Sequence, residues 1–163
     1  MPYQMKKILY TTDLSPAAPK VFQYAIFLAN QYDAHITSMH VLEELSPDAK
    51  FALALHFSDE DAEEMMLKKQ KEAEEEMFKR VENLCQSTTL SSGACIDPDR
   101  LTIKVERGFP EEKILKVSKE MGADIIVMGA HEKGFTHTFL GSVAKRVLRR
   151  SKIPVVIVPV TEE

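Results

Sequence analysis

Short apolar segments alternate with amphipathic segments of helical periodicity, and this alternation restricts the fold more than any other feature of the sequence. Apolar runs typical of strands cover residues 7–12, 35–41, 101–107, 124–129 and 154–160. Four segments between these runs carry apolar residues at the three- and four-residue spacing of a helix. Strands that alternate with helices predict an α/β fold, in which a parallel sheet has helices on both faces.

Residues that begin and end helices predict the helix boundaries. Serine and proline favour the start of a helix, and glycine favours the position just after its last turn. The expected helices are one that begins with Ser15 and Pro16, one over residues 58–84, one between Pro110 and Gly122, and one that begins near Gly141 and Ser142.

Residues 43–57, EELSPDAKFALALHF, lie between the second strand and the long helix. A segment in this place can cover a ligand crevice, bind a partner or pack beside the second strand. We favour packing beside the second strand as the simplest of the three.

The apolar character of the strands predicts their order in the sheet. The first and fourth strands are the most apolar, and the third alternates as an outer strand does. An order of 3-2-1-4-5 places the first and fourth side by side. The order reverses direction between them, and parallel sheets bind ligands at such a point, outside the carboxyl ends of the strands. Residues 11–13 and 128–131 are therefore expected to meet in one crevice.

Length and charge narrow the function classes. A chain of 163 residues predicts one domain over residues 1–163. The net charge of -4 gives no reason to expect nucleic-acid binding, and no run is apolar enough to cross a membrane. The first residues lack the apolar core of a signal peptide, which favours the cytoplasm. In that reducing compartment we expect Cys85 and Cys95 to be free thiols rather than a disulfide.

The glycine-containing loop after the fourth strand differs from a P-loop. Gly129 and Gly134 have the spacing of two P-loop glycines, but Phe135 stands where the lysine belongs. The helix that begins at Gly141 and Ser142 is the better anion site, because a helix N-terminus presents unpaired N–H groups and positive dipole charge. Gly141 has no Cβ to block a phosphate, and the Ser142 hydroxyl can donate to a phosphate oxygen or cap the helix.

Polar residues near the crevice are further candidates. Asp13 can accept hydrogen bonds from ribose or adenine, or can simply shape the turn before the first helix. His131 can contact phosphate, but metal binding and catalysis are not expected without a second ligand or a paired carboxylate at suitable spacing. Lys133 is a candidate phosphate contact. His40 fits a strand position and carries no functional signal.

Four stretches of the sequence are distinctive when taken together: KKILYTTDLS, HVLEE, ERGFPEEKIL and ADIIVMGAHEKGFTHTFLGSVAKRVLRRSKIPVVIVP. With these stretches the chain resembles, over essentially its whole length, a universal stress protein of the single-domain kind. The resemblance implies a Rossmann-like fold of the adenine nucleotide alpha-hydrolase type. Nucleotide-binding members carry a loop of the form G-x2-G-x9-G-[S/T]. Gly129, Gly141 and Ser142 match that loop, whereas Glu132 replaces its second glycine and the loop is one residue shorter.

By this resemblance the crevice binds an adenine nucleotide, with ATP favoured over AMP and ADP and with Mg²⁺ as a possible companion ion. The implied adenosine contacts are Thr11, Thr12, Asp13, Val41 and Met128. The implied ribose and phosphate contacts are Gly129, His131, Gly141, Ser142 and Val143. No residue stands out as a general base, so at most slow ATP hydrolysis is expected.

Two alternatives belong to other function classes. One is a dimeric stress scaffold that binds no nucleotide; the Glu132 carboxylate, which would repel phosphate, favours it, whereas Asp13 and Gly141 argue against it. The other is an adenylyl-transferring enzyme, which needs a histidine signature after the first strand that the sequence TTDLSPAAPK lacks.

The fifth strand is expected to form a dimer interface. In the order 3-2-1-4-5 it lies at a sheet edge, and residues 155–158 are all β-branched. Two copies can pair antiparallel about a two-fold axis, and the family resemblance implies the same dimer. We expect a homodimer through residues 155–160, in which Pro159 keeps the paired segment short.

Overall fold

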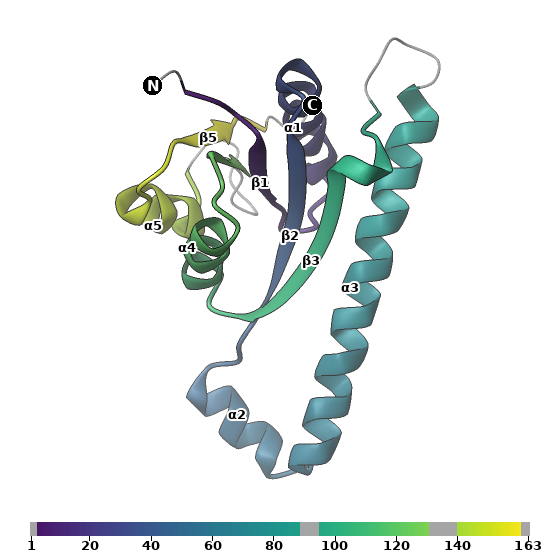
Figure 1. Cartoon of the computed structure of the whole chain (residues 1–163). Helices are drawn as coiled ribbons and strands as arrows, with labels where there is room; N and C mark the ends of the chain where they lie inside the picture. The colour runs from purple at the N-terminus through teal and green to yellow at the C-terminus, as the bar shows by residue number, and fades with distance from the viewer. Residues whose placement is uncertain (1–2, 89–94, 131–139, 161–163) are drawn as a thin grey trace.

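A computed structural model describes residues 3–88, 95–130 and 140–160. In this part of the chain, one parallel sheet has the order β3-β2-β1-β4-β5, which confirms the order predicted from the sequence (Figure 1). The strands are β1 Lys7–Thr11, β2 His35–Glu43, β3 Leu101–Gly108, β4 Ile125–Gly129 and β5 Val155–Val158. The helices are α1 Ala18–Tyr32, α2 Pro47–Ala54, α3 Asp59–Thr88, the short 3-10 helix η1 Pro98–Arg100, α4 Pro110–Glu120 and α5 Ser142–Arg150.

Helices cover both faces of the sheet, because side chains on each strand alternate between the two faces. Ile8 and Tyr10 of β1 pack with α1 and with the last turns of α3, whereas Leu9 packs with α4 and α5. All three side chains are buried. The sheet therefore has an apolar core on each side, and its middle strands are buried between the two.

The first helix begins later than the sequence predicts. Ser15 and Pro16 were expected to start it, but α1 starts at Ala18. The backbone N–H of Ser15 instead donates to the Asp13 carboxylate at 2.9 Å, and Leu14 adopts a left-handed φ of 58°. These contacts form a tight turn after β1, and that turn must finish before the helix can begin.

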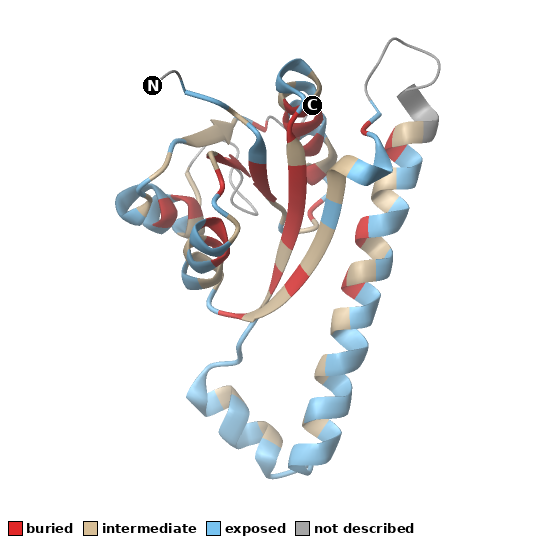
Figure 2. Cartoon of the chain, in the orientation of Figure 1, coloured by how far each residue is buried: buried red, intermediate tan, exposed pale blue. Residues whose placement is uncertain are grey.

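Residues 43–57 contain a helix that the sequence did not predict, and their expected packing beside β2 is wrong. The strand β2 continues to Glu43, and α2 begins where Ser46 accepts a hydrogen bond from the Ala49 N–H at 3.2 Å. No residue of α2 is buried. We call residues 44–67 the arm: in Figure 2 they extend beyond the end of the sheet and are mostly exposed.

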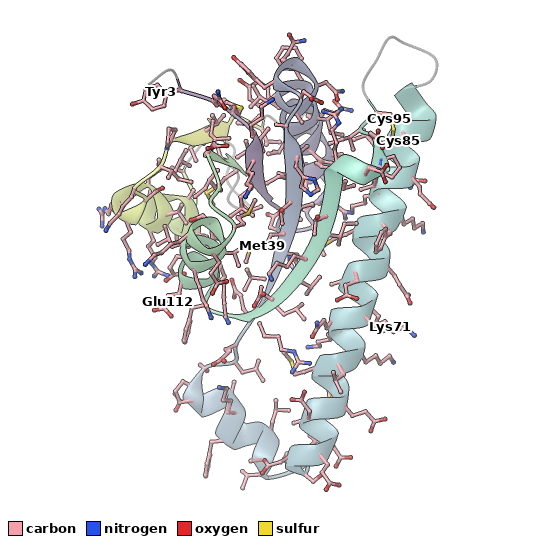
Figure 3. The ribbon with its side chains drawn as sticks, viewed as in Figure 1. Tyr3, Met39, Lys71, Cys85, Cys95 and Glu112 are labelled. Carbon is pink, nitrogen blue, oxygen red and sulfur yellow. A yellow bond between two sulfur atoms is a disulfide. The ribbon has the colours of Figure 1, made fainter. Side chains whose placement is uncertain are left out.

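The two cysteines form a disulfide, so the expectation of free thiols is wrong. Cys85 near the end of α3 and Cys95 before η1 are bonded, with their Cα atoms 4.8 Å apart (Figure 3). Each cysteine adjoins a buried residue, Leu84 or Ile96, and both of these pack in the core beside α1. The hydrophobic core therefore brings the two cysteines together. The expectation of free thiols was based on the cell compartment alone and did not include this packing.

Candidate functional site

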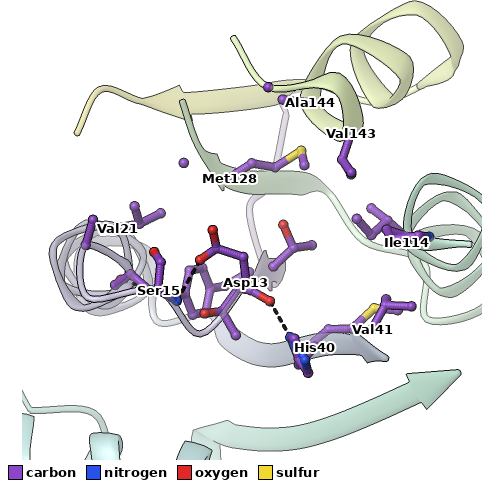
Figure 4. A pocket seen from close by; sticks show the side chains of 18 of the residues that line it. Asp13, Ser15, Val21, His40, Val41, Ile114, Met128, Val143 and Ala144 are labelled. Carbon is purple, nitrogen blue, oxygen red and sulfur yellow. Dashed lines mark hydrogen bonds between the residues drawn. The ribbon is translucent and has the colours of Figure 1, made fainter. Parts of the chain in front are cut away.

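A cavity of about 580 Å³ opens at the carboxyl ends of the central strands (Figure 4). This volume lies within the range of roughly 300–1,000 Å³ that is usual for small-molecule sites. The strand order creates the cavity, because α1, which follows β1, and α5, which follows β4, pack on opposite faces of the sheet. Nine of the residues predicted from the sequence line it: Thr11, Thr12, Asp13, Val41, Met128, Gly129, Gly141, Ser142 and Val143. The other two, His131 and Lys133, lie outside the described residues.

The turn after β1 forms one side of the cavity. Asp13 is exposed there, and one of its carboxylate oxygens accepts the Ser15 N–H. The Thr12 hydroxyl accepts the Leu14 N–H at 3.0 Å, and the Thr12 N–H donates to the carbonyl of Met39 at 2.9 Å. A carboxylate can accept about four hydrogen bonds, so Asp13 keeps capacity for donors on a ligand.

Arg80 of α3 forms hydrogen bonds to the backbone of the same turn. Its guanidinium donates to the carbonyls of Ser15 at 2.8 Å and Leu14 at 2.7 Å, and to the Glu76 carboxylate at 2.7 Å. Hydrogen bonds from a charged donor are stronger than neutral ones. Arg80 therefore fixes the backbone that carries Asp13, although it lies far from the turn in the sequence.

His40 lines the cavity, although the sequence gave no functional signal for it. Its Nδ1 lies 2.8 Å from the carbonyl oxygen of Thr12. A carbonyl only accepts, so Nδ1 carries the proton, and in the neutral ring Nε2 is then an acceptor. In the parallel register Thr11 pairs with Met39, which places His40 next to the end of β1. Only the register of the two strands could have identified this residue.

The N-terminus of α5 forms the opposite side of the cavity. The first intrahelical bond runs from the Lys145 N–H to the Gly141 carbonyl at 3.0 Å, so the N–H groups of Ser142, Val143 and Ala144 precede it. Such groups and the helix dipole favour an anion. Gly141 has φ −60° and ψ 160°, which any residue can adopt. The conformation therefore does not require glycine there, and its missing side chain instead leaves room on the cavity wall.

Apolar side chains form the remaining walls. Val41, Ile114 and Met128 project into the cavity between the polar sides (Figure 4). Tyr10 also lines it, and burial raises the pKa of its phenol to about 12. The phenol donates to the Ala18 carbonyl at 3.1 Å. Tyr10 is thus a neutral structural group at physiological pH.

Gly129 has a packing role that the sequence did not reveal. A Cβ at this position would lie 3.1 Å from Cγ2 of Val21, a buried residue of α1, and 3.7 Å from Cγ2 of Val160. Glycine at the end of β4 therefore lets α1 approach the strand closely. A ligand is not needed to explain it.

Residues 3–88, 95–130 and 140–160 contain no group of three or more histidine, cysteine or acidic side chains that could hold a metal ion. None of the helices in those ranges has the length and apolar character needed to span a membrane.

Known proteins similar to this chain share its fold. Universal stress protein G of Shigella flexneri is 31% identical over 85% of this chain and 87% of that protein. Universal stress protein MJ0577 of Methanocaldococcus jannaschii is 28% identical, with 97% of each chain covered. A solved structure of MJ0577 superposes with a TM-score of 0.71 at 25% identity, over 98% of this chain and 99% of that one.

Two solved structures of more distant proteins share the fold. A universal stress protein in complex with cAMP has a TM-score of 0.56 at 19% identity, covering 96% of this chain and 98% of that one. The universal stress protein of Archaeoglobus fulgidus in complex with dAMP has a TM-score of 0.52 at 19% identity, with the same coverage of 96% and 98%. The sequence itself matches the Universal stress protein family over residues 5–159. The chain therefore belongs to the universal stress protein family.

Proposed function

We propose that the cavity binds an adenine nucleotide, with ATP as the favoured ligand, and that the protein acts as a regulatory dimer in stress responses. One observation carries the proposal: the cavity places an exposed carboxylate, Asp13, opposite the N-terminus of α5, with apolar walls between them. Adenine suits the apolar walls at Val41 and Met128. Ribose hydroxyls or the adenine amino group can donate to Asp13.

The phosphates suit the other side of the cavity. The N–H groups at the start of α5 offer donors, and Gly141 leaves the approach open. The ligand class is supported by the cAMP and dAMP complexes of proteins with the same fold. Mg²⁺ would bind together with the phosphates of the nucleotide. We propose binding and regulation as the role, with at most slow hydrolysis.

Thermal melting with and without MgATP tests the proposal. Ligand at about 100 times its dissociation constant adds about 2.7 kcal/mol, which corresponds to a rise in melting temperature of roughly 5–11 °C for a chain of this size. The Gly141→Val and Ser142→Ala double variant should melt near the parent temperature without ligand but lose the rise, because a valine side chain fills the phosphate approach. If no adenine nucleotide raises the melting temperature at millimolar concentration, the result favours a dimeric scaffold that binds no nucleotide.

We also propose a homodimer through β5 and the residues after it, 155–160. The strand lies at the edge of the sheet. The carbonyls of Pro154 and Val158 accept N–H groups of Ile126 and Ala130, so the peptide groups of alternate residues, such as Ile157, point away from β4. These groups are available to a second copy, as at other open sheet edges.

The variant Ile157→Pro tests this dimer, because the only backbone donor that it removes is an outward N–H, and edge strands tolerate proline there. The variant also loses the partly buried Ile157 side chain, so it should be somewhat less stable than the parent. Light scattering on a sizing column should show a dimeric parent and a monomeric variant that still melts cooperatively. Val156→Pro is the matched control, since that N–H points toward β4, and its loss should destabilise the sheet itself. A monomeric parent at micromolar concentration contradicts the dimer.

A further inference from the structure

The arm, residues 44–67, exposes large apolar side chains that the fold does not use. Phe51 is 69% exposed and Leu55 is 67% exposed, and they lie one turn apart on the same side of α2. More than a third of each of Leu45, Phe57, Met65 and Leu67 is also exposed. Single exposed apolar residues are ordinary, but a group on one short segment marks an interaction surface.

The arm holds its shape without burying these side chains. Ser46 caps α2, and Ser58 caps α3 by accepting the Asp61 N–H at 3.1 Å while its own hydroxyl donates to the Asp61 carboxylate at 2.7 Å. Glu63 accepts from Arg107 of β3 at 2.8 Å, which ties α3 to the sheet edge. Hydrogen bonds therefore hold the arm, and these apolar side chains stay exposed to solvent.

The charge of the arm limits which molecule that is. The arm has seven acidic residues and one lysine, a net charge of -6, within a chain of net charge -4. The rest of the chain is consequently positive overall. A second arm brought against this one would meet like charge, and so would a membrane of anionic lipids. A helix with an apolar face bordered by lysine or arginine meets both the apolar and the electrostatic requirement.

We propose that the arm is a docking surface for a basic amphipathic helix of another protein. Phe51 and Leu55 contact the apolar face of that helix, and the acidic side chains around them contact its basic border. Short helices bind grooves and surfaces in this way through apolar residues three or four positions apart. The arm exposes this surface whether or not the cavity binds a nucleotide.

Fluorescence anisotropy with a labelled amphipathic peptide of leucine and lysine tests the proposal. The parent should bind this peptide, should not bind a peptide of the same pattern made of leucine and glutamate, and should bind less tightly as salt is raised. The Phe51→Ser and Leu55→Ser double variant should bind the basic peptide at least about tenfold less tightly, since it loses two large apolar contacts.

Two matched variants separate the apolar contribution from the electrostatic one. Phe78→Ser removes a side chain that is 59% exposed on α3 but outside the arm, and it should bind like the parent. Asp59→Asn with Glu60→Gln and Glu64→Gln keeps the apolar group and should also weaken binding, because it removes negative charge. The parent, the Phe51/Leu55 variant and the Phe78 variant should melt at similar temperatures, because these side chains are exposed.

Several results would overturn the proposal. The first is a Phe51→Ser and Leu55→Ser variant that binds the basic peptide as tightly as the parent, since charge alone then explains binding. The second is self-association of the parent that this variant abolishes, since the occupant is then a second copy. The third is binding to phosphatidylglycerol vesicles that the same variant loses, since the occupant is then a lipid surface.

Discussion

Reducing the Cys85–Cys95 disulfide should lower the stability of the protein by an amount that follows from the loop it closes. The two cysteines are 10 residues apart in sequence. In the chain-entropy description, a cross-link that closes a loop of about 10 residues removes enough freedom from the unfolded chain to contribute about 2.7 kcal/mol. For a chain of this length, that free energy corresponds to a fall in melting temperature of roughly 5–11 °C.

Scanning calorimetry of the oxidised protein, with and without a phosphine reductant, measures this fall. The Cys85→Ser and Cys95→Ser double variant should melt near the reduced protein, and the reductant should not change its melting temperature. The reduced protein should still unfold cooperatively, because Leu84 and Ile96 remain available to the core beside α1. The double variant thus serves as the control for any effect of the reductant on other groups.

Thiol titration gives the result that would refute the reasoning. The folded oxidised protein should show no reactive thiol, and unfolding it without reductant should expose none. Two thiols that react in the folded protein after mild oxidation, or a melting temperature that reductant leaves unchanged, would mean that the core does not bring the cysteines together.

Three further predictions concern residues around the cavity. Burial raises the pKa of Tyr10 to about 12, so the stability that its neutral phenol contributes should be complete below pH 10. The unfolding free energy should then fall by about 3 kcal/mol between pH 10 and 12. Denaturant titration of Tyr10→Phe should not show this loss. Gly129→Ala should cost about 1 kcal/mol in a denaturant titration, because its new methyl group crowds Val21. Arg80→Ala should lower the unfolding free energy by about 2 kcal/mol and weaken ATP binding in calorimetry, whereas removing the exposed charge of Lys79 should do neither.

The parts of the fold that could be predicted are those that short-range patterns determine. The strand order followed from the apolar character of the first and fourth strands, and the start of α5 followed from Gly141 and Ser142. Gly122, with a left-handed φ of 63°, ends α4 as its position in the sequence predicted. These features depend on neighbouring residues, so the sequence is enough to locate them.

The parts that could not be predicted depend on residues far apart in the sequence. The position of His40 at the cavity depends on the register of β1 against β2. The hydrogen bonds from Arg80 to the turn after β1 depend on how α3 packs. Residues 43–57 differ from the expectation for another reason. Packing beside the second strand was favoured for them, whereas the structure leaves apolar residues such as Phe51 exposed to solvent.

The cavity lies across the junction between two parts of the sheet. The strands β1, β2 and β3 form one part, and β4 and β5 form the other. The two parts meet along the β1–β4 ladder, and the Asp124 carboxylate reinforces it by accepting the N–H groups of Lys6 at 2.8 Å and Lys7 at 2.9 Å. Asp13 lies on the first part and Ser142 on the second, so any molecule that fills the cavity contacts both. Separation of the two parts by local unfolding would then require release of the bound molecule. Amide hydrogen exchange along β4 would therefore slow when the cavity is filled.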